Sequence, residues 1–255
     1  MMFVPKTPKL LQLSEFYPSV IENLNTIFGS STLVYVDRAN VYGWQQKLWR
    51  RIDPKRLYQF LKSFENIQDI KWYFWTLVWD SKSEKNITEL KLVGYTVRTK
   101  PVKIMKHSID VSSIKELSSP NILKSFITKW LLHHLNTKSI EIFNQELKKL
   151  NDKWILNIEE KKCNFDVEIG VDMMLDAERI IDADTYILWS GDSDFADIVH
   201  YLLHKGKKVY IFCTSKRVSK ELAASKAIIF DIQKIRDFIC WDREMKCTID
   251  PTLFP

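Results

Sequence analysis

Apolar runs alternate with segments of helical spacing along most of this chain. The expected strands are LVYV (33–36), IKWYFWTLVW (70–79), YTVRTK (95–100), TYILW (185–189), KVYIFC (208–213) and AIIFDI (227–232). Helical patterns lie between them, including one that begins at Pro54 after Asp53, a residue pair typical of a helix N-terminus. Strands that are apolar throughout and separated by helices are typical of a parallel sheet covered on both faces. We therefore predict an α/β fold with a mainly parallel central sheet flanked by helices.

One segment breaks this alternation. Residues 106–152 contain no Gly, few strand signals and two helical patterns, at 121–135 and 139–150. The first pattern places Ile122, Phe126, Trp130 and Leu131 along one stripe, which we expect to be buried against the core or against another subunit. The predicted organisation is an N-terminal arm at 1–31, one domain at 32–239 with a helical insertion at about 106–152, and a tail at 240–255.

Charge adds a preference for an anionic partner. The 255-residue chain has a formal net charge of +6. Nine lysines against five acidic residues between positions 102 and 153 put most of this surplus in the insertion. We expect these lysines to contact a nucleic acid, with homo-oligomer formation through the insertion as the alternative.

Composition also bounds the compartment. Hydrophobic residues make up 45% of the chain, yet no apolar run approaches the roughly 18 residues that span a membrane, and no N-terminal signal pattern is present. The four cysteines lack paired or zinc-binding spacing, which is typical of reduced thiols. We expect a cytoplasmic protein without membrane contact.

Two acidic clusters follow predicted strands. Asp37 and Asn40 come directly after 33–36, and Asp192 and Asp194 after 185–189. In open α/β sheets ligands bind beyond the carboxyl ends of the strands, so parallel pairing would bring these four side chains to one edge. Oxygen ligands of this kind suit Mg2+ or Mn2+. The alternative is that the residues only cap helices and form turns.

A third set of carboxylates lies on the helix predicted near residue 170. Glu168, Asp172 and Asp176 recur every four residues, so they form one stripe of like charge. Either a cation meets this stripe or it is solvated, and the spacing alone favours a solvated face. Asp166, near the start of the helix, is explained equally well as a favourable first-turn acid.

A basic, aromatic segment, WQQKLWRRIDPKR, occupies residues 44–56. Arg50 and Arg51 would neutralise phosphates while Trp44 stacks on a base, as in proteins that bind single-stranded RNA. A solvated helix face with a core tryptophan accounts for the segment equally well. His200 and His204 have a spacing that can bind zinc, but no third ligand is nearby, so we interpret them as ordinary helix residues.

Several motifs in order resemble one family. LVYVDRANVY, GYTVRTKPVK, KKCNFDVEIGVDMMLDA, YILWSGDSDFADIVHYLLHKGKKVYIFC and SKELAASKAIIFDI together look like the NYN domain, a PIN-like nuclease fold. The resemblance covers roughly 32–105 and 154–235. Two departures are that Arg38 stands where a small residue is commoner and that the turn KKCNFD is one residue longer than usual.

The resemblance implies a divalent metal surrounded by the DxxN loop, the acidic helix and the SGDSDF loop. By matching position, catalytic roles are implied for Asp37, Asn40, Asp172, Asp192 and Asp194. The implied metal ligands are Asp37, Asp166, Asp172, Asp192 and Asp194. The predicted RNA-binding residues are Lys162, Arg38, Trp44, Arg50 and Arg51.

The function that follows is metal-dependent hydrolysis of RNA phosphodiester bonds with Mg2+ or Mn2+, on single-stranded or structured RNA. The alternative is an RNA-binding or scaffolding module with the nuclease fold and little or no turnover. GDSDF lacks the Gly-rich phosphate cradle with its Lys, which argues against an ATPase. The first strand is followed by DRA rather than DxD, which argues against a phosphatase with an Asp nucleophile.

Overall fold

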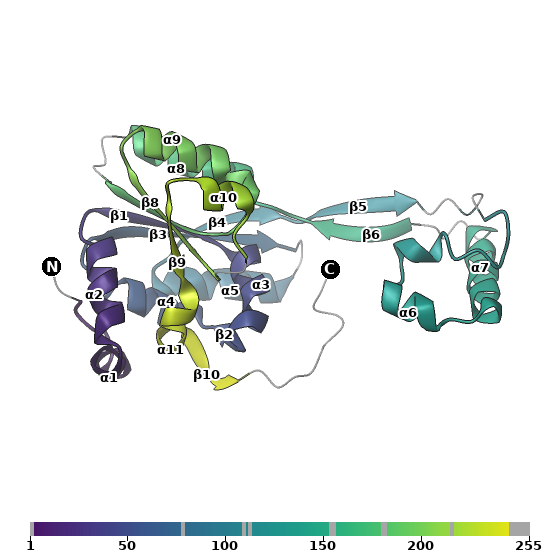
Figure 1. The fold of residues 1–255 in the computed structure, drawn as a ribbon, viewed down its shortest axis with the longest axis horizontal. Coiled ribbons are helices and arrows are strands. Elements are labelled where there is room, and N and C mark those ends of the chain that lie inside the picture. Colours follow the sequence, from purple (N-terminus) through teal and green to yellow (C-terminus); the bar gives the residue numbers. More distant parts are fainter. Residues whose placement is uncertain are drawn as a thin grey trace. The chain divides into compact units, whose positions relative to one another are not determined.

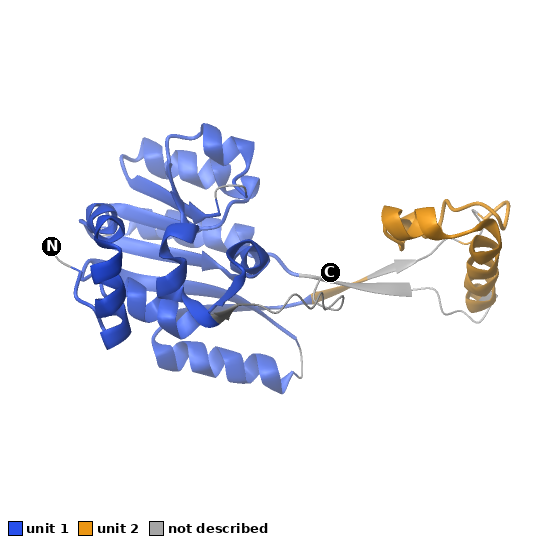
Figure 2. Ribbon diagram, turned by 60° about the horizontal axis from the view of Figure 1, so that its bottom comes forward, with its two compact units in different colours: residues 1–102, 163–253 blue, residues 103–162, 254–255 orange. Residues whose placement is uncertain are grey.

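The structure, a computed structural model, describes residues 3–77, 80–108, 111, 114–152, 157–179, 183–214 and 217–244. The chain forms two compact units (Figure 2). Unit 1 comprises Met1–Val102 with Cys163–Leu253, and unit 2 comprises Lys103–Lys162 with Phe254–Pro255. Most of the predicted tail, from residue 245 onward, lies outside the described residues. None of the helices described is long and apolar enough to cross a membrane.

Unit 1 is built on a six-stranded sheet with the order β4-β3-β1-β7-β8-β9 (Figure 1). Every neighbouring pair in it is parallel. The strands are β1 (Thr32–Asp37), β3 (Ile67–Thr76), β4 (Thr96–Pro101), β7 (Thr185–Trp189), β8 (Lys208–Cys213) and β9 (Ile228–Asp231). The predicted α/β fold with a parallel central sheet is confirmed.

Helices cover both faces of this sheet, with α8 and α9 on one face and α3, α4 and α5 on the other (Figure 1). The helices of unit 1 are α1 (Pro8–Phe16), α2 (Pro18–Ile27), α3 (Arg38–Leu48), α4 (Pro54–Leu61), α5 (Ser81–Val93), α8 (Asp166–Glu178), α9 (Ala196–His204), α10 (Lys220–Ala224) and α11 (Arg236–Ile239). Short 3-10 turns η3 (Ser193–Phe195) and η4 (Ile232–Ile235) precede α9 and α11. Strands β2 (Arg50–Ile52) and β10 (Cys240–Glu244) form a separate antiparallel pair.

Local chemistry explains where these helices begin and end. Asp53 caps α4 as predicted, since its carboxylate accepts a hydrogen bond from the backbone N–H of Lys55 at 2.9 Å. Gly94 ends α5 in the left-handed region, with φ of 118°. This backbone angle favours glycine, and a side chain at position 94 would also require the Tyr58 ring to move.

Unit 2 carries the insertion on an antiparallel pair of strands, β5 (Lys103–Ser108) and β6 (Asn157–Lys162). The sequence pattern did not predict this pair of strands. Between the strands lie η2 (Leu123–Ser125), α6 (Lys129–His134) and α7 (Thr137–Asp152). The side-chain amide of Asn144 is buried in α7 and donates to the carbonyls of Leu117 and Ser119, at 2.6 and 2.8 Å, which fixes the loop before η2.

The helix predicted over 121–135 is broken. Thr128 has an extended backbone and caps α6, so the chain turns between η2 and α6 instead of continuing one helix. Phe126, Trp130 and Leu131 are exposed at 44%, 70% and 43% in the single chain. Burial of the predicted stripe against the core is therefore wrong, and burial against another subunit stays a prediction.

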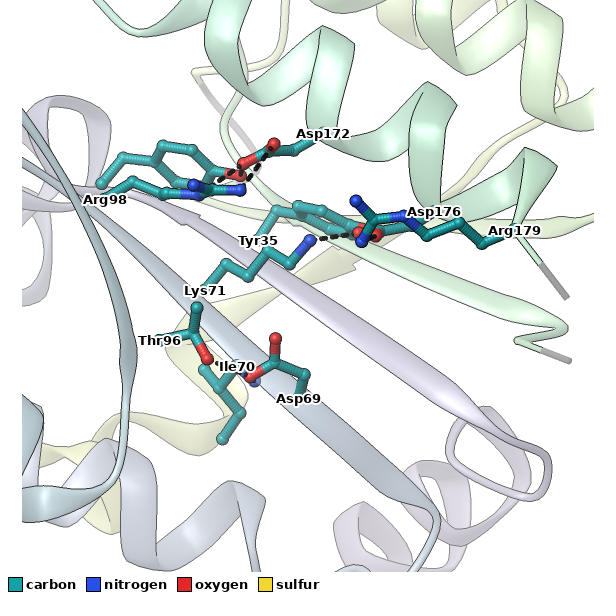
Figure 3. A network of polar contacts seen from close by, with 10 residues as sticks. Tyr35, Asp69, Ile70, Lys71, Thr96, Arg98, Asp172, Asp176 and Arg179 are labelled. Carbon is teal, nitrogen blue, oxygen red and sulfur yellow. Dashed lines mark hydrogen bonds and ion pairs between the residues drawn. The ribbon is translucent and has the colours of Figure 1, made fainter. Parts of the chain in front are cut away.

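Asp172 and Asp176 of the acidic stripe on α8 face the sheet, which contradicts the solvated face that the spacing favoured (Figure 3). Strands β3 and β4 supply a basic partner for each carboxylate. The pairs are Glu168 with Lys100, Asp172 with Arg98, and Asp176 with Lys71. Tyrosine hydroxyls add to two of them, because Tyr73 donates to Asp172 and Tyr35 donates to Asp176. A spacing of four residues could not reveal these counter-ions, since they come from strands far away in the sequence.

The pair of Lys71 and Asp176 is buried, with side chains 9% and 4% exposed. Removing one partner of a buried ion pair leaves the other charge without compensation. We therefore predict that Asp176→Asn lowers the free energy of unfolding by about 3 kcal/mol. Glu168→Gln is the matched control, because its carboxylate is 40% exposed and pairs at that exposure are worth about 1 kcal/mol or less. Urea denaturation of both variants tests this, and equal losses would contradict the ranking.

Candidate functional site

A cavity of about 200 Å³ lies where β1 and β7 end. Four carboxylates from three separate parts of the chain line it. The lining residues are Asp37, Ala39, Asn40, Tyr73, Trp75, Cys163, Asn164, Phe165, Asp166, Asp192 and Asp194. The sequence prediction that both acidic clusters meet at one sheet edge is thus realised, because the two strands are parallel neighbours.

Asp37 is the last residue of β1 and is buried. Its carboxylate caps α3 by accepting the backbone N–H of Ala39 at 3.0 Å, and it accepts the side-chain amide of Asn40 at 2.7 Å. Burial raises the pKa of Asp37 above its ordinary value, and the charge of Asp192 raises it further against these hydrogen bonds. Asn40 therefore holds the orientation of Asp37 within the cavity wall.

Asp192 and Asp194 lie on the turn that leaves β7. The carboxylate of Asp192 caps η3 through a 3.4 Å hydrogen bond from the backbone N–H of Asp194. Ser190 helps to shape the turn, since its hydroxyl oxygen accepts the backbone N–H of Asp192 at 3.3 Å. The capping role that the sequence left as an alternative is present, and it coexists with a place in the cavity wall.

Gly191 lets a second loop approach this turn. The carbonyl of Gly191 accepts the backbone N–H of Ser219 at 2.9 Å. A Cβ atom at position 191 would lie 2.0 Å from the carbonyl oxygen of Arg217, so no other residue fits without moving the backbone. Sequence reasoning missed this requirement, because nothing in SGDSDF indicates contact with residues 217–219.

Asp166 reaches the cavity from the first position of α8. Its carboxylate accepts the side-chain amide of Asn164 at 2.7 Å. Partial burial raises the pKa of Asp166 to about 6, with further increases from the charges of Asp37, Asp192 and Asp194 and from a hydrogen bond with Asp194. The four carboxylates therefore interact electrostatically across one cavity.

Asp172 is not among the residues that line the cavity. Its carboxylate accepts the Tyr73 hydroxyl at 2.8 Å and the guanidinium of Arg98 at 3.1 Å. Asp166 and Asp172 are six residues apart on α8, so at 3.6 residues per turn they point in different directions. The predicted catalytic and metal-binding roles of Asp172 are therefore corrected to an ion pair that joins α8 to the sheet.

The predicted RNA-binding residues fare differently. Trp44 is only 1% exposed, so the prediction that it stacks on a base is wrong, and Trp49 at 61% is the exposed ring of this segment. Arg50 is half-buried and pairs with Asp237 at 2.8 Å, which commits its guanidinium to α11. Arg51 is exposed on β2 and does not line the cavity. Lys162 ends β6, and its side chain lies outside the described part of the structure.

The carboxylates of the cavity differ from the other carboxylates of α8 in their ion pairs. Within the described ranges, no ion pair involves Asp37, Asp166, Asp192 or Asp194, and no Lys, Arg or His lines the cavity. Asp37 is buried, Asp166 and Asp192 are half-buried and Asp194 is exposed. Like charges on the buried and half-buried groups are unfavourable unless a cation joins them. An unpaired set of carboxylate oxygens with one amide is the donor chemistry that suits a hard divalent ion.

The positions of the side chains also bear on metal binding. Among the residues that the structure describes, no group of three or more His, Cys, Asp or Glu side chains converges closely enough to hold a metal ion. His200 and His204 are both exposed on α9 and belong to no such group. The donors of the cavity thus fit a divalent ion by their chemistry, and side-chain rearrangement would have to bring them together.

Comparison with known families agrees with the motifs. Residues 114–233 match the family model described as the NYN domain. This part of the chain is similar to the NYN domain, which confirms the predicted resemblance over these residues. Asp166, Asp192 and Asp194 fall inside the matched range, while Asp37 and Asn40 precede it. The match begins within unit 2, so it includes part of the insertion.

A curated relative extends the similarity beyond that range. The chain is 23% identical over 211 residues to the low amplitude and bright protein LabA of Synechococcus elongatus, which covers 82% of this chain and 88% of LabA. Among solved structures, a protein of unknown function, VPA0982 from Vibrio parahaemolyticus, is similar at 19% identity with a TM-score of 0.48. That similarity covers 79% of this chain and 93% of the Vibrio chain.

The raised pKa of Asp166 predicts how stability depends on pH without metal. The folded state binds the Asp166 proton more tightly than the unfolded state does, because the pKa rises from 3.8 to about 6. Stability should therefore fall as pH rises from about 4 to about 6, and the loss should persist above pH 6.

The amide of Asp166→Asn cannot ionise, so this variant avoids the unfavourable negative charge. It should melt about 2–4 °C above the wild type at pH 7 in chelator and at the same temperature at pH 4. Thermal unfolding with EDTA at both pH values measures this. Parallel pH profiles for the two proteins would show that ionisation of Asp166 does not destabilise the folded state.

Gly191 and Gly170 form a matched pair for the loop contact. Gly191→Ala should lower the free energy of unfolding by about 1–3 kcal/mol, because its methyl group collides with the backbone of Arg217. A methyl group at Gly170 on α8 meets nothing within 4 Å, so Gly170→Ala should raise stability by about 0.5–1 kcal/mol. Guanidinium denaturation compares the two variants. A Gly191→Ala protein as stable as the wild type would contradict the close contact between Gly191 and the backbone of Arg217.

Proposed function

We propose that this protein is a metal-dependent ribonuclease that hydrolyses RNA phosphodiester bonds at the four-carboxylate cavity. The observation that carries the proposal is the contrast in charge on α8. Glu168, Asp172 and Asp176 each have a basic partner, whereas Asp166 joins three other aspartates in a cavity that no basic residue lines in the described part of the chain. The similarity of residues 114–233 to the NYN domain supports the same proposal, because that domain has a PIN-like nuclease fold.

The residues of the cavity divide into two roles. Asp37, Asp166, Asp192 and Asp194 would hold Mg2+ or Mn2+. The bound ion supplies Lewis-acid activation of water and neutralises negative charge that develops on the phosphate. Asn40 fixes the orientation of Asp37 through its 2.7 Å hydrogen bond, and its carbonyl oxygen stays available to a ligand. Hydrolysis by an activated water requires no nucleophilic side chain from the protein.

RNA is proposed as the substrate from charge and from the family. A net charge of +6 favours an anionic polymer, and the cavity offers carboxylates to a metal rather than to the polymer itself. The cysteine spacing that is typical of reduced thiols supports a cytoplasmic location as part of this proposal.

A second candidate is an RNA-binding or scaffolding module with little or no turnover. One observation favours it, which is that no three described carboxylates converge closely enough for a metal. Both candidates bind RNA, but only the ribonuclease loses activity when the metal is removed. Incubation of the purified protein with labelled RNA and labelled DNA, in Mg2+, Mn2+ or EDTA, separates them.

Two conservative substitutions test the site directly. Asp192→Asn and Asp194→Asn each remove one ligand charge without changing side-chain volume, so RNA cleavage in Mg2+ should fall at least about 100-fold. Asp197→Asn is the matched control, because Asp197 is an exposed aspartate in the first turn of α9 outside the cavity. Initial cleavage rates give the comparison. Full activity of both cavity variants would refute the metal assignment.

A further inference from the structure

Arg38 occupies an unusual position beside the cavity. It is the first residue of α3 and directly follows Asp37. Its guanidinium carbon lies 4.4 Å from the ring centroid of Phe74, 4.8 Å from that of Trp75 and 5.7 Å from that of Tyr42. Trp75 itself lines the cavity, so the guanidinium contacts a residue of the cavity wall.

The charge of Arg38 has no anionic partner in the described part of the chain. No carboxylate there forms an ion pair with it, and no hydrogen bond to its side chain is found. Its nitrogen atoms are also absent from the buried polar atoms that lack a partner, so the unused N–H groups are open to solvent. Arg38 thus combines a half-buried cation with free donors.

Local helix energetics do not account for an arginine here. The N-terminus of a helix carries partial positive charge, which disfavours a basic residue in the first turn. Burial also lowers the pKa of Arg38 from its ordinary value, although a guanidinium stays protonated. Leucine or methionine could cover the same rings without a desolvation cost. Cation–π attraction to these rings offsets part of that cost, but it does not use the N–H donors of the guanidinium.

We propose that Arg38 binds a phosphate of single-stranded RNA next to the bond cleaved in the cavity. This inference rests on the proposed ribonuclease function and adds a substrate-binding residue to it. The guanidinium lies over the rings of Phe74 and Trp75, and no hydrogen bond within the described residues uses its N–H groups. A planar pair of N–H groups matches two phosphate oxygens, a geometry that the ammonium of lysine does not reproduce.

The surrounding rings favour a single strand over a duplex. Tyr42 is 41% exposed and Trp75 is half-buried at the cavity rim. Partly exposed rings beside a cation suit the splayed nucleotides of a single strand, because a base can stack while its phosphate pairs with the arginine. Stacked bases in a duplex cannot reach such rings.

The test uses Arg38→Met, which keeps contact with the rings and removes the charge, and Arg38→Lys, which keeps the charge and loses the planar edge. Lys91→Met is the control, because Lys91 is an exposed residue of α5 that does not line the cavity. Each change is made in the wild type for cleavage of a 12-nucleotide RNA in Mg2+. Each is also made with Asp192→Asn, which should slow cleavage at least about 100-fold, for binding of the same RNA and of its duplex by fluorescence anisotropy.

We expect Arg38→Met to raise KM and Kd for the single strand about tenfold, with a smaller effect on kcat. The slope of log K against log salt should decrease by about 0.7. Arg38→Lys should keep the slope and still bind several-fold more weakly, whereas Lys91→Met should leave KM and Kd within about twofold. Melting temperatures verify that each variant is folded, and Arg38→Lys decides the matter if Arg38→Met does not fold.

The possible failures are distinguishable. If the wild type cleaves RNA and Arg38→Met resembles Lys91→Met in KM, Kd and salt slope, the role of Arg38 is refuted while the ribonuclease function stands. An equal loss of affinity for single strand and duplex overturns the preference for single strands. A wild type that neither binds nor cleaves RNA refutes the proposed function itself.

Discussion

The need to balance buried negative charge governs this fold and its candidate site. Helix α8 carries a stripe of carboxylates that would repel one another if they faced only solvent or apolar core. Lys71, Arg98 and Lys100 on the adjacent strands meet that stripe. The helix is therefore attached to the sheet by ion pairs as well as by apolar contacts, and the same balance is missing only at its N-terminal end within the described residues.

That end of α8 meets the carboxyl ends of β1 and β7. Strand pairing in parallel places Asp37 beside the turn that carries Asp192 and Asp194, while Asp166 approaches from the helix. The positive N-terminus of α8 favours the charged form of Asp166, yet burial and three neighbouring carboxylates raise its pKa to about 6. A metal ion would supply the positive charge that strands β3 and β4 supply to the rest of the helix.

Much of the fold could be predicted from the pattern of apolar residues, since strands buried on both faces differ clearly from amphipathic helices. The meeting of Asp37 with Asp192 was predictable for the same reason, because it depends only on parallel pairing. Trp44 was misassigned although its spacing held the answer. Val41, Trp44 and Leu48 recur at helical spacing and form the buried face of α3.

Other features depend on contacts between distant segments, which a single sequence does not reveal. The role of Asp172 is decided by Arg98 on β4, and the need for Gly191 by the backbone of Arg217. The antiparallel pair of β5 and β6 was not predicted, because its residues, KIMKHS and NIEEKK, are largely polar and do not alternate clearly. Tertiary pairing outweighs local propensity in such strands.

A crystal of the protein grown with Mn2+ and measured at the manganese absorption edge tests the central claim most directly. Charge imbalance predicts an anomalous peak within the cavity, coordinated by oxygens of Asp37, Asp166, Asp192 and Asp194. The carboxylates of Asp172 and Asp176 should remain paired with Arg98 and Lys71. Full manganese occupancy elsewhere, or none at millimolar Mn2+ with the cavity unchanged, would contradict it.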